Sequence, residues 1–191
     1  MEVGIMTSIK SVSLGAKRRA RQAGLTLAET LLVLAIGALA IVGGTLLYLQ
    51  ATAGNKLNTG INQFVTLQSG IRSLYAGQST YGGLDNDLMT DSNAAPSDMV
   101  VGDGDIRNAW GGDVTVASIS SDNQFTITFD AVPNNACVKL STLNPGGSGG
   151  SGLAEISAGG NVLSVPVSTA SAVTACNSGA TDSNTIIWTF N

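Results

Sequence analysis

Histidine is absent from this chain of 191 residues, and its absence excludes several kinds of active site. Histidine is the commonest general base, the usual partner of a nucleophilic serine and the commonest zinc ligand in proteins. Serine and threonine are abundant, yet none of them has an activating partner in the sequence. A phosphate-binding loop is also lacking. We therefore expect no enzyme, no metal site and no cofactor.

Cysteine is scarce, since only Cys137 and Cys176 are present and they lie far apart. Neither a CxxC spacing nor a histidine supports a metal site. In an exported domain, two cysteines favour one disulfide over two free thiols. Closing a loop of about 40 residues in this way would stabilise the fold by roughly 4 kcal/mol if the effect is one of chain entropy.

Positive charge is scarce too, and most of it lies at the start of the chain. Five of the nine basic residues precede Gly24, where Glu2 is the only acid. After Gly24, four basic residues stand against twelve acidic ones, which gives that part a net charge of −8. It has no basic patch with interleaved aromatic residues, so we expect no nucleic-acid binding.

One long apolar run dominates what the chain does contain. Residues 25–49 are long enough, as a helix, to cross the hydrocarbon core of a membrane with some tilt. Glu29 is the only ionisable side chain in this run. An unpaired charge there costs about 3 kcal/mol, so we expect Glu29 to have a partner. The alternative is an acid favoured by the positive N-terminal end of the helix.

Small side chains recur in the apolar run at intervals of three and four residues. Such a stripe lets helices approach closely in lipid, but glycine and alanine are also common in lipid-facing positions, and the sequence leaves both readings open. Gly43 and Gly44 mark a point where the helix could bend or open locally. The stripe consists of Thr30, Val33, Gly37, Ala40 and Gly44.

The segment before the apolar run is typical of a leader. It ends in the basic cluster KRRARQAG, and its small residues Ala23 and Gly24 precede the apolar run. A secretory signal peptide has its small-residue cleavage site after the apolar region instead. Cleavage between Gly24 and Leu25 would therefore leave the apolar segment on the mature protein. An uncleaved signal anchor is the alternative, and both readings place the N-terminus in the cytoplasm.

An amphipathic pattern continues the helix beyond the apolar run. Apolar residues keep helical spacing with polar residues between them, and no proline occurs before Pro96. We predict one helix over residues 26–75, whose second half lays an apolar stripe on a soluble domain. Three glycines (54, 60 and 70) weaken it locally. The stripe residues are Leu57, Ile61, Phe64, Ile71 and Leu74.

The remaining residues predict an antiparallel sheet. Residues 76–108 read as a long connection, with a short helix at 84–89. Phe125, Ile127 and Phe129 alternate with polar residues, the period of a half-buried strand. One sheet face can then cover the helix stripe. The tract 146–152, GGSGGSG, is a flexible loop. The predicted strands are residues 114–117, 124–132, 137–140, 162–167 and 185–190.

Two further features have ordinary explanations. Trp110 with Gly111 and Gly112 predicts a buried aromatic anchor and a tight turn, rather than a ligand-stacking site. Calcium is suggested by Asp85, Asp87, Asp91, Asp103 and Asp105, but these residues lack the spacing of an EF-hand and polar loops collect aspartate in any case.

Together, the basic leader ending in Gly24, then Leu25, the apolar run and Glu29 resemble type IV pilin precursors. The long leader, and leucine rather than phenylalanine after the cut, resemble the type IVb group. The segments AAPSDMV (94–100) and NAWGG (108–112) resemble the conjugative thin-pilus, PilS-type, major pilins. The chain departs from many type IVa pilins in lacking a proline in the membrane helix.

This resemblance implies an α+β pilin fold with a long N-terminal helix on an antiparallel sheet and a disulfide-bounded C-terminal region. It divides the chain into a leader (1–24), a transmembrane half-helix (25–49) and a globular domain (50–191). A prepilin peptidase would cut after Gly24 and methylate Leu25, and Glu29 would pair with the Leu25 ammonium of a neighbouring subunit. The implied bonded cysteines are Cys137 and Cys176.

The implied function is a helical homopolymer for adhesion, aggregation or mating contact. Its partners would be copies of itself, an assembly ATPase, an inner-membrane platform and an outer-membrane secretin. The precursor would lie in the inner membrane and the filament on the cell surface. Two alternatives remain: a pseudopilin of a type II secretion system, and a signal-anchored periplasmic binding domain.

Overall fold

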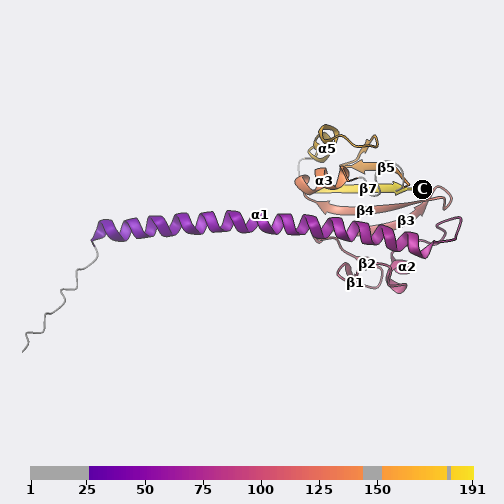
Figure 1. The fold of residues 1–191 in the computed structure, drawn as a ribbon, viewed down its shortest axis with the longest axis horizontal. Coiled ribbons are helices and arrows are strands. Elements are labelled where there is room, and N and C mark those ends of the chain that lie inside the picture. Colours follow the sequence, from indigo (N-terminus) through magenta and orange to yellow (C-terminus); the bar gives the residue numbers. More distant parts are fainter. Residues whose placement is uncertain (1–25, 144–151, 180–181) are drawn as a thin grey trace, which may run out of the picture. The chain divides into compact units, whose positions relative to one another are not determined.

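A computed structural model describes residues 26–143, 152–179 and 182–191 of the chain. The chain divides into two compact units, Met1–Leu46 and Leu47–Asn191. One helix, α1 (Leu27–Leu74), runs through 48 residues and belongs in part to each unit (Figure 1). The predicted helix of residues 26–75 is therefore confirmed to within one residue at each end.

In the first unit, the described residues are the start of α1. Every described side chain there is exposed. The helix is long and apolar enough to cross a membrane by its length and composition. It is unbroken at Gly43 and Gly44, where the sequence suggested a bend or local opening.

In the second unit, α1 buries one side against a sheet. Phe64, Leu67 and Ile71 are fully buried at helical spacing. Phe64 lies 4.4 Å from Trp188, centroid to centroid. The predicted stripe is confirmed at Phe64 and Ile71, while Leu57, Ile61 and Leu74 are partly buried at its margins.

The sheet has five strands, all antiparallel, in the order β3-β4-β7-β5-β6 (Figure 1). Phe125, Ile127 and Phe129 of β4 are all fully buried, as their alternation predicted. A separate hairpin pairs β1 (Val100–Gly102) with β2 (Asp105–Ile106). The strands of the sheet are β3 (Val114–Ile119), β4 (Gln124–Val132), β5 (Leu153–Ala158), β6 (Asn161–Leu163) and β7 (Asn184–Phe190).

Three short helices complete the second unit: α2 (Asn86–Asp91), α3 (Asn134–Ser141) and α5 (Thr169–Cys176). The helix expected at 84–89 is thus confirmed two residues later, as α2. Asn86 of α2 closes the outer edge of β3. Its Nδ2 donates to the Val114 carbonyl and its Oδ1 accepts from the Val116 N–H, both at 2.8 Å.

Two strand predictions need correction. Residues 137–140 are part of helix α3, because four residues are too few to distinguish the period of a strand from that of a helix. The strand expected over 162–167 ends at Leu163, and Pro166, which follows soon after, has no N–H for a ladder. Strand β5 and helix α5 were not predicted at all.

Candidate assembly surface

Thr26 caps the start of α1. The Glu29 N–H lies 3.3 Å from Thr26 Oγ1 and 3.0 Å from the Thr26 carbonyl oxygen. A threonine before the helix with glutamate three residues later is the capping-box pattern. The sequence analysis missed this cap, although the T-x-x-E spacing signals it. The cap fixes the start of the helix at Leu27, two residues before Glu29, the only acidic side chain in its apolar half.

Glu29 is exposed in the first turn of α1. In the described part of the chain, its carboxylate has no hydrogen-bond or ion-pair partner, and both ion pairs found there are made by Arg107. The helix N-terminus favours a negative charge nearby, but only by about 0.3–1 kcal/mol at an exposed site. That is less than the cost of the same charge in a hydrocarbon core. The helix dipole alone does not account for a carboxylate at this position in lipid.

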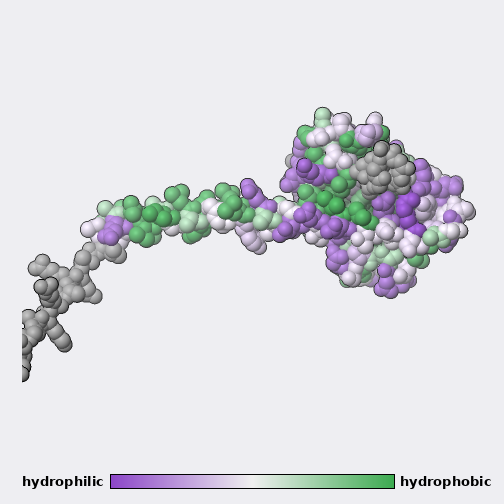
Figure 2. Space-filling view, in the orientation of Figure 1, coloured by the Kyte–Doolittle hydropathy of each residue, from purple (hydrophilic) through white to green (hydrophobic). Residues whose placement is uncertain are grey.

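Around Glu29, the first half of α1 presents apolar side chains on every side. Their exposed fractions run from 57 to 78%, and Figure 2 shows the hydrophobic surface along this helix. Burying such surface contributes roughly 25 cal/mol per Å². A helix of this kind is stable only in lipid or against other apolar surfaces. The large apolar residues are Leu27, Leu31, Leu32, Val33, Leu34, Ile36, Leu39, Ile41, Val42, Leu46, Leu47 and Leu49.

The glycines of α1 differ between its two halves. A Cβ added at Gly37, Gly43 or Gly44 would meet nothing within 4 Å. At Gly60, the same Cβ would lie 2.5 Å from Trp110 Cη2, and at Gly70 it would overlap the Ala94 carbonyl. Packing within the subunit thus requires Gly60 and Gly70, whereas a Cβ at Gly54 would also meet nothing within 4 Å. Nothing within the subunit requires the first-half glycines, which leaves that surface for contacts with other molecules.

The NAWGG segment forms the tight turn that was predicted. Asn108 is buried, and its Oδ1 accepts from the N–H groups of Trp110 (2.9 Å) and Gly112 (3.1 Å). Gly111 has a φ of +85°, and a Cβ at Gly112 would overlap the Asp130 carbonyl. Trp110 is partly rather than fully buried, with its ring on Gly60. The turn therefore anchors the α1 helix to the sheet domain.

The two cysteines form the expected disulfide. Cys137 in α3 and Cys176 in α5 are bonded, both are buried, and their Cα atoms lie 5.9 Å apart. The bond joins two helices, and its cysteines are separated by 39 residues in the sequence. It therefore holds the C-terminal third of the chain to its middle.

The aspartates near β1 and β2 surround one arginine. Arg107 lies 3.0 Å from Asp105 and 2.8 Å from Asp113. The hydrogen bond to Asp105 and the charges of Asp105 and Asp113 raise the pKa of Arg107 above its usual value. In residues 26–143, 152–179 and 182–191, no group of three or more acidic or cysteine side chains is placed to hold a metal ion.

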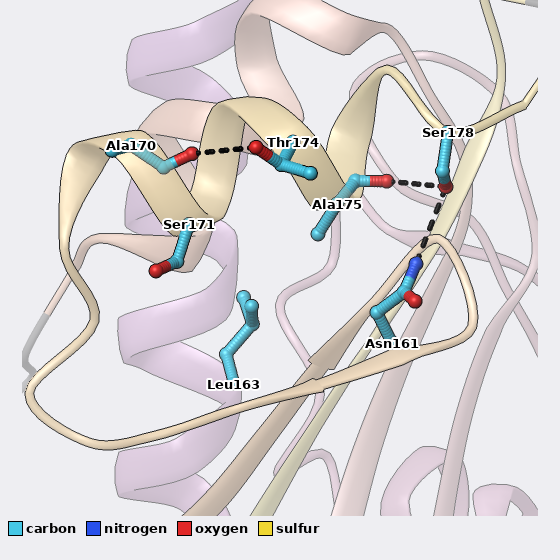
Figure 3. Close-up of a pocket in the computed structure, with 7 residues that line it drawn as sticks. All are labelled: Asn161, Leu163, Ala170, Ser171, Thr174, Ala175 and Ser178. Carbon is cyan, nitrogen blue, oxygen red and sulfur yellow. Dashed lines mark hydrogen bonds between the residues drawn. The ribbon is translucent and has the colours of Figure 1, made fainter.

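A hollow between α5 and β6 is lined by neutral groups (Figure 3). Ser178 Oγ donates to the Ala175 carbonyl at 2.7 Å, and Thr174 Oγ1 donates to the Ala170 carbonyl at 3.1 Å. Its polar side chains are thus engaged within the domain, and no titratable group lines it. The hollow offers no acid or base for catalysis. The lining residues are Asn161, Leu163, Ala170, Ser171, Thr174, Ala175 and Ser178.

Comparison with known proteins identifies the family. The model of the Bundlin family matches residues 50–191. The chain belongs to the Bundlin family. It is 32% identical over 144 residues to the major structural subunit of bundle-forming pilus from Escherichia coli O111:H-, with 74% of this chain and 75% of the relative covered. The same subunit from Escherichia coli O127:H6 is 32% identical over 126 residues, with 64% and 65% covered.

Two solved pilins are also similar to this Bundlin-family chain. TcpA, a type IV pilin from Vibrio cholerae El Tor biotype, is 13% identical, with a TM-score of 0.49, 72% of this chain covered and 99% of TcpA. The type IVb pilin PilS from Salmonella typhi is 28% identical, with a TM-score of 0.47 and coverages of 71% and 96%.

The family assignment confirms the prediction of a type IVb pilin with a long helix on an antiparallel sheet. Of the expected site residues, the structure describes Glu29, Cys137 and Cys176. It brings the two cysteines together and leaves Glu29 on the exposed helix. Gly24 and Leu25 lie outside the described residues, as does most of the tract 146–152.

Proposed function

We propose that this chain is a subunit of a helical surface filament of the type IVb pilus kind. The observation that carries the proposal is the apolar half of α1, exposed on every side with one carboxylate near its start. Such a helix is stable in a bilayer before assembly and in a bundle of like helices afterwards. The major-subunit relatives support the same conclusion.

Each of the three expected segments has its own role in this proposal. Residues 1–24 are a cytoplasmic leader that a prepilin peptidase removes after Gly24, which leaves Leu25 as a methylated N-terminus. Residues 25–49 hold the subunit in the inner membrane, and residues 50–191 form the globular domain. The family match to residues 50–191 supports the last boundary. An ATPase, a membrane platform and an outer-membrane secretin drive assembly, and the filament serves adhesion, aggregation or mating contact.

Glu29 pairs with the Leu25 ammonium of the neighbouring subunit in this proposal. Each charge then offsets part of the desolvation cost of the other, and removing one partner of such a buried pair costs about 3–5 kcal/mol. An unpaired charge penalises every other stagger of the helices, so the pair also sets the axial register. The free energy involved corresponds to a loss of two or more orders of magnitude in assembly equilibrium, at about 1.4 kcal/mol for each tenfold step.

The test replaces Glu29 by Gln and by Ala in cells that make the filament. We expect long surface filaments to disappear by electron microscopy, while mass spectrometry still finds the subunit cut after Gly24. Glu155→Gln, an exposed acid in β5, is the matched control and should leave filaments at wild-type numbers. Normal filaments from both Glu29 variants would refute the pairing, and a wild type that makes only short periplasmic fibres would favour a pseudopilin.

A further inference from the structure

In the part of the chain that the structure describes, nothing buries the face of the sheet turned away from the core. The residues that alternate with the buried ones on each strand are partly or fully exposed, and two of their rows lie in the middle of the sheet. The pairing register aligns Thr115, Thr128, Ile187, Ser157 and Val162 in one row across all five strands. The second row holds Ala117, Thr126 and Thr189, and ends at Glu155. We call the eight neutral residues of these rows the threonine face.

The threonine face is uncharged and stiff. Threonine, valine and isoleucine branch at Cβ, so few rotamers remain open to them on a strand. Ordering them in a contact therefore costs less conformational entropy than ordering lysine or glutamate. Val162, at 66% exposure, and the half-buried Ile187 add apolar area to the hydroxyl groups. These are properties of a surface that can bind at low entropic cost.

The charges of the chain lie elsewhere. Of the twelve acids after Gly24, seven fall between residues 85 and 113, where Arg107 is the only basic residue. Two copies with a net charge of −8 each repel one another wherever these acids meet, because like charges in an interface oppose association. Glu155 marks one end of the threonine face, and Asp130, which accepts a hydrogen bond from Thr185, lies beyond its first row. Between them, copies can meet without burying like charges.

The size of the face indicates how it is used. Eight residues, on strands about 4.8 Å apart and in rows about 7 Å apart, give roughly 270 Å². A stable pair of proteins buries about 800 Å² on each partner, so two free subunits would not remain together through this contact. A filament repeats the face along its length, and many weak contacts made at once give a strong association.

We propose that the threonine face joins filaments side by side, and that its occupant is the same face of a second copy in a neighbouring filament. This inference rests on the proposed polymerisation. The charge map and the area are what favour contact between filaments over contact between free subunits.

The test compares filaments from cells that make full-length variants of the chain. Thr128→Asp and Thr126→Asp place a charge at the centre of the threonine face. Thr174→Asp, on the exposed side of α5, adds the same charge to the same residue type elsewhere. Thr128→Ser keeps the hydroxyl group. Electron microscopy counts filaments per bundle, low-speed sedimentation gives the bundled fraction, and the total yield of sheared filaments reports folding and assembly.

We expect Thr128→Asp and Thr126→Asp to lower the bundled fraction about tenfold or more at unchanged filament yield, since a small loss per copy is multiplied along the filament. Thr174→Asp and Thr128→Ser should bundle like the wild type. Added salt should increase wild-type bundling, because about 0.1 M salt screens the flanking acids beyond roughly 10 Å.

Three results would overturn the proposal: wild-type filaments that stay single, Thr128→Asp and Thr126→Asp filaments that bundle normally, or equal dispersal by Thr174→Asp. If one of the two aspartate variants gives no filaments, the bundled fraction of the other aspartate variant decides the test. If the wild type forms no filaments, the proposed function fails, and the lateral contact fails with it.

Discussion

The two halves of α1 meet different surroundings, although they are one continuous helix. Leu31 and Leu34 of the first half are 58% and 68% exposed, whereas Phe64 and Leu67 of the second half are fully buried. The second half buries its apolar side chains within the subunit. The first half leaves all of them for lipid or for other copies. An apolar helix thus stabilises the folded domain only where the domain supplies its own cover.

The difference between the two halves is tested most directly by truncating one apolar side chain in each half of α1. Phe64→Ala removes a ring that packs on Trp188, Phe129 and Phe190, so we expect a loss of about 3–5 kcal/mol in the free energy of unfolding. Leu34→Ala should leave that free energy within about 0.5 kcal/mol of wild type. Denaturant unfolding of the full chain in detergent, followed by tryptophan fluorescence, measures both. Equal losses would contradict the division.

The disulfide should affect the stability of the globular domain on which the second half of α1 packs, and it should not affect the first half of α1. Replacing Cys137 and Cys176 together by serine is expected to cost about 2–4 kcal/mol of stability, because the unfolded chain regains the freedom of a long loop. The same fluorescence assay measures the loss. Circular dichroism of the full chain in detergent should show that helical signal remains after the globular domain has unfolded, as expected if the apolar half of α1 stays helical. Reduction of the wild type should reproduce the effect. A double variant as stable as the wild type would show that α3 and α5 hold without the bond.

The same substitution, glycine to alanine, can be compared in the two halves of α1. Gly60→Ala forces a methyl group into the Trp110 ring and should cost about 1–3 kcal/mol. Gly37→Ala meets nothing within 4 Å and should not lower the unfolding free energy, since alanine is the better helix former. If Gly37→Ala instead reduces filament numbers with the domain intact, neighbouring helices approach closely there. Unfolding curves and filament counts on the same two variants separate these effects.

The smallest expected effect concerns pH. Tyr75 is buried at the end of α1, and its hydroxyl donates to the Gly82 carbonyl at 3.0 Å. Burial, followed by the charges of Asp85 and Asp122, raises the pKa of Tyr75 above 10.0. The neutral phenol is thus favoured in the folded state. Its contribution is complete below the unfolded pKa of 10.0 and is lost as pH rises through the higher folded value.

Tyr75→Phe should therefore cost about 1 kcal/mol near neutral pH, the net value of one hydrogen bond. It should also reduce the loss of stability above pH 10. Tyr48→Phe, on the exposed surface of α1, is the control and should keep the wild-type profile. Unfolding midpoints recorded from pH 7 to pH 11 give the comparison, and identical alkaline slopes in all three proteins would contradict it.

Local periodicity was enough to predict α1, β3, β4 and β7. These elements are long or strongly patterned, so neighbouring residues carry the signal. Helix α5 could not be found in this way. Its sequence, TASAVTAC, is rich in residues with modest helix preference, and what orders it is the burial of Ala172, Ala175 and Cys176 together with the bond to Cys137. Those contacts come from distant parts of the chain.

In the candidate site too, features that depend on local sequence could be predicted, and features that depend on distant contacts could not. Glu29 and the two cysteines were visible in the sequence because each is conspicuous in its setting. The Thr26 cap was equally readable from its spacing and was overlooked. The role of Gly60 was not readable, since it depends on the Trp110 ring 50 residues later. A sequence shows where a helix lies more readily than what touches it.

The bonds that Asn86 makes to β3 have a consequence for how such a chain is handled in the cell. In the proposed assembly, subunits gather in a bilayer before they polymerise, and a bare strand would invite its copies to add to it without limit. One amide side chain occupies that rim of the sheet, and the opposite rim offers only the three residues of β6. Among the described residues, strand-by-strand stacking into fibrils therefore finds only short stretches of free edge in this sheet on which to begin.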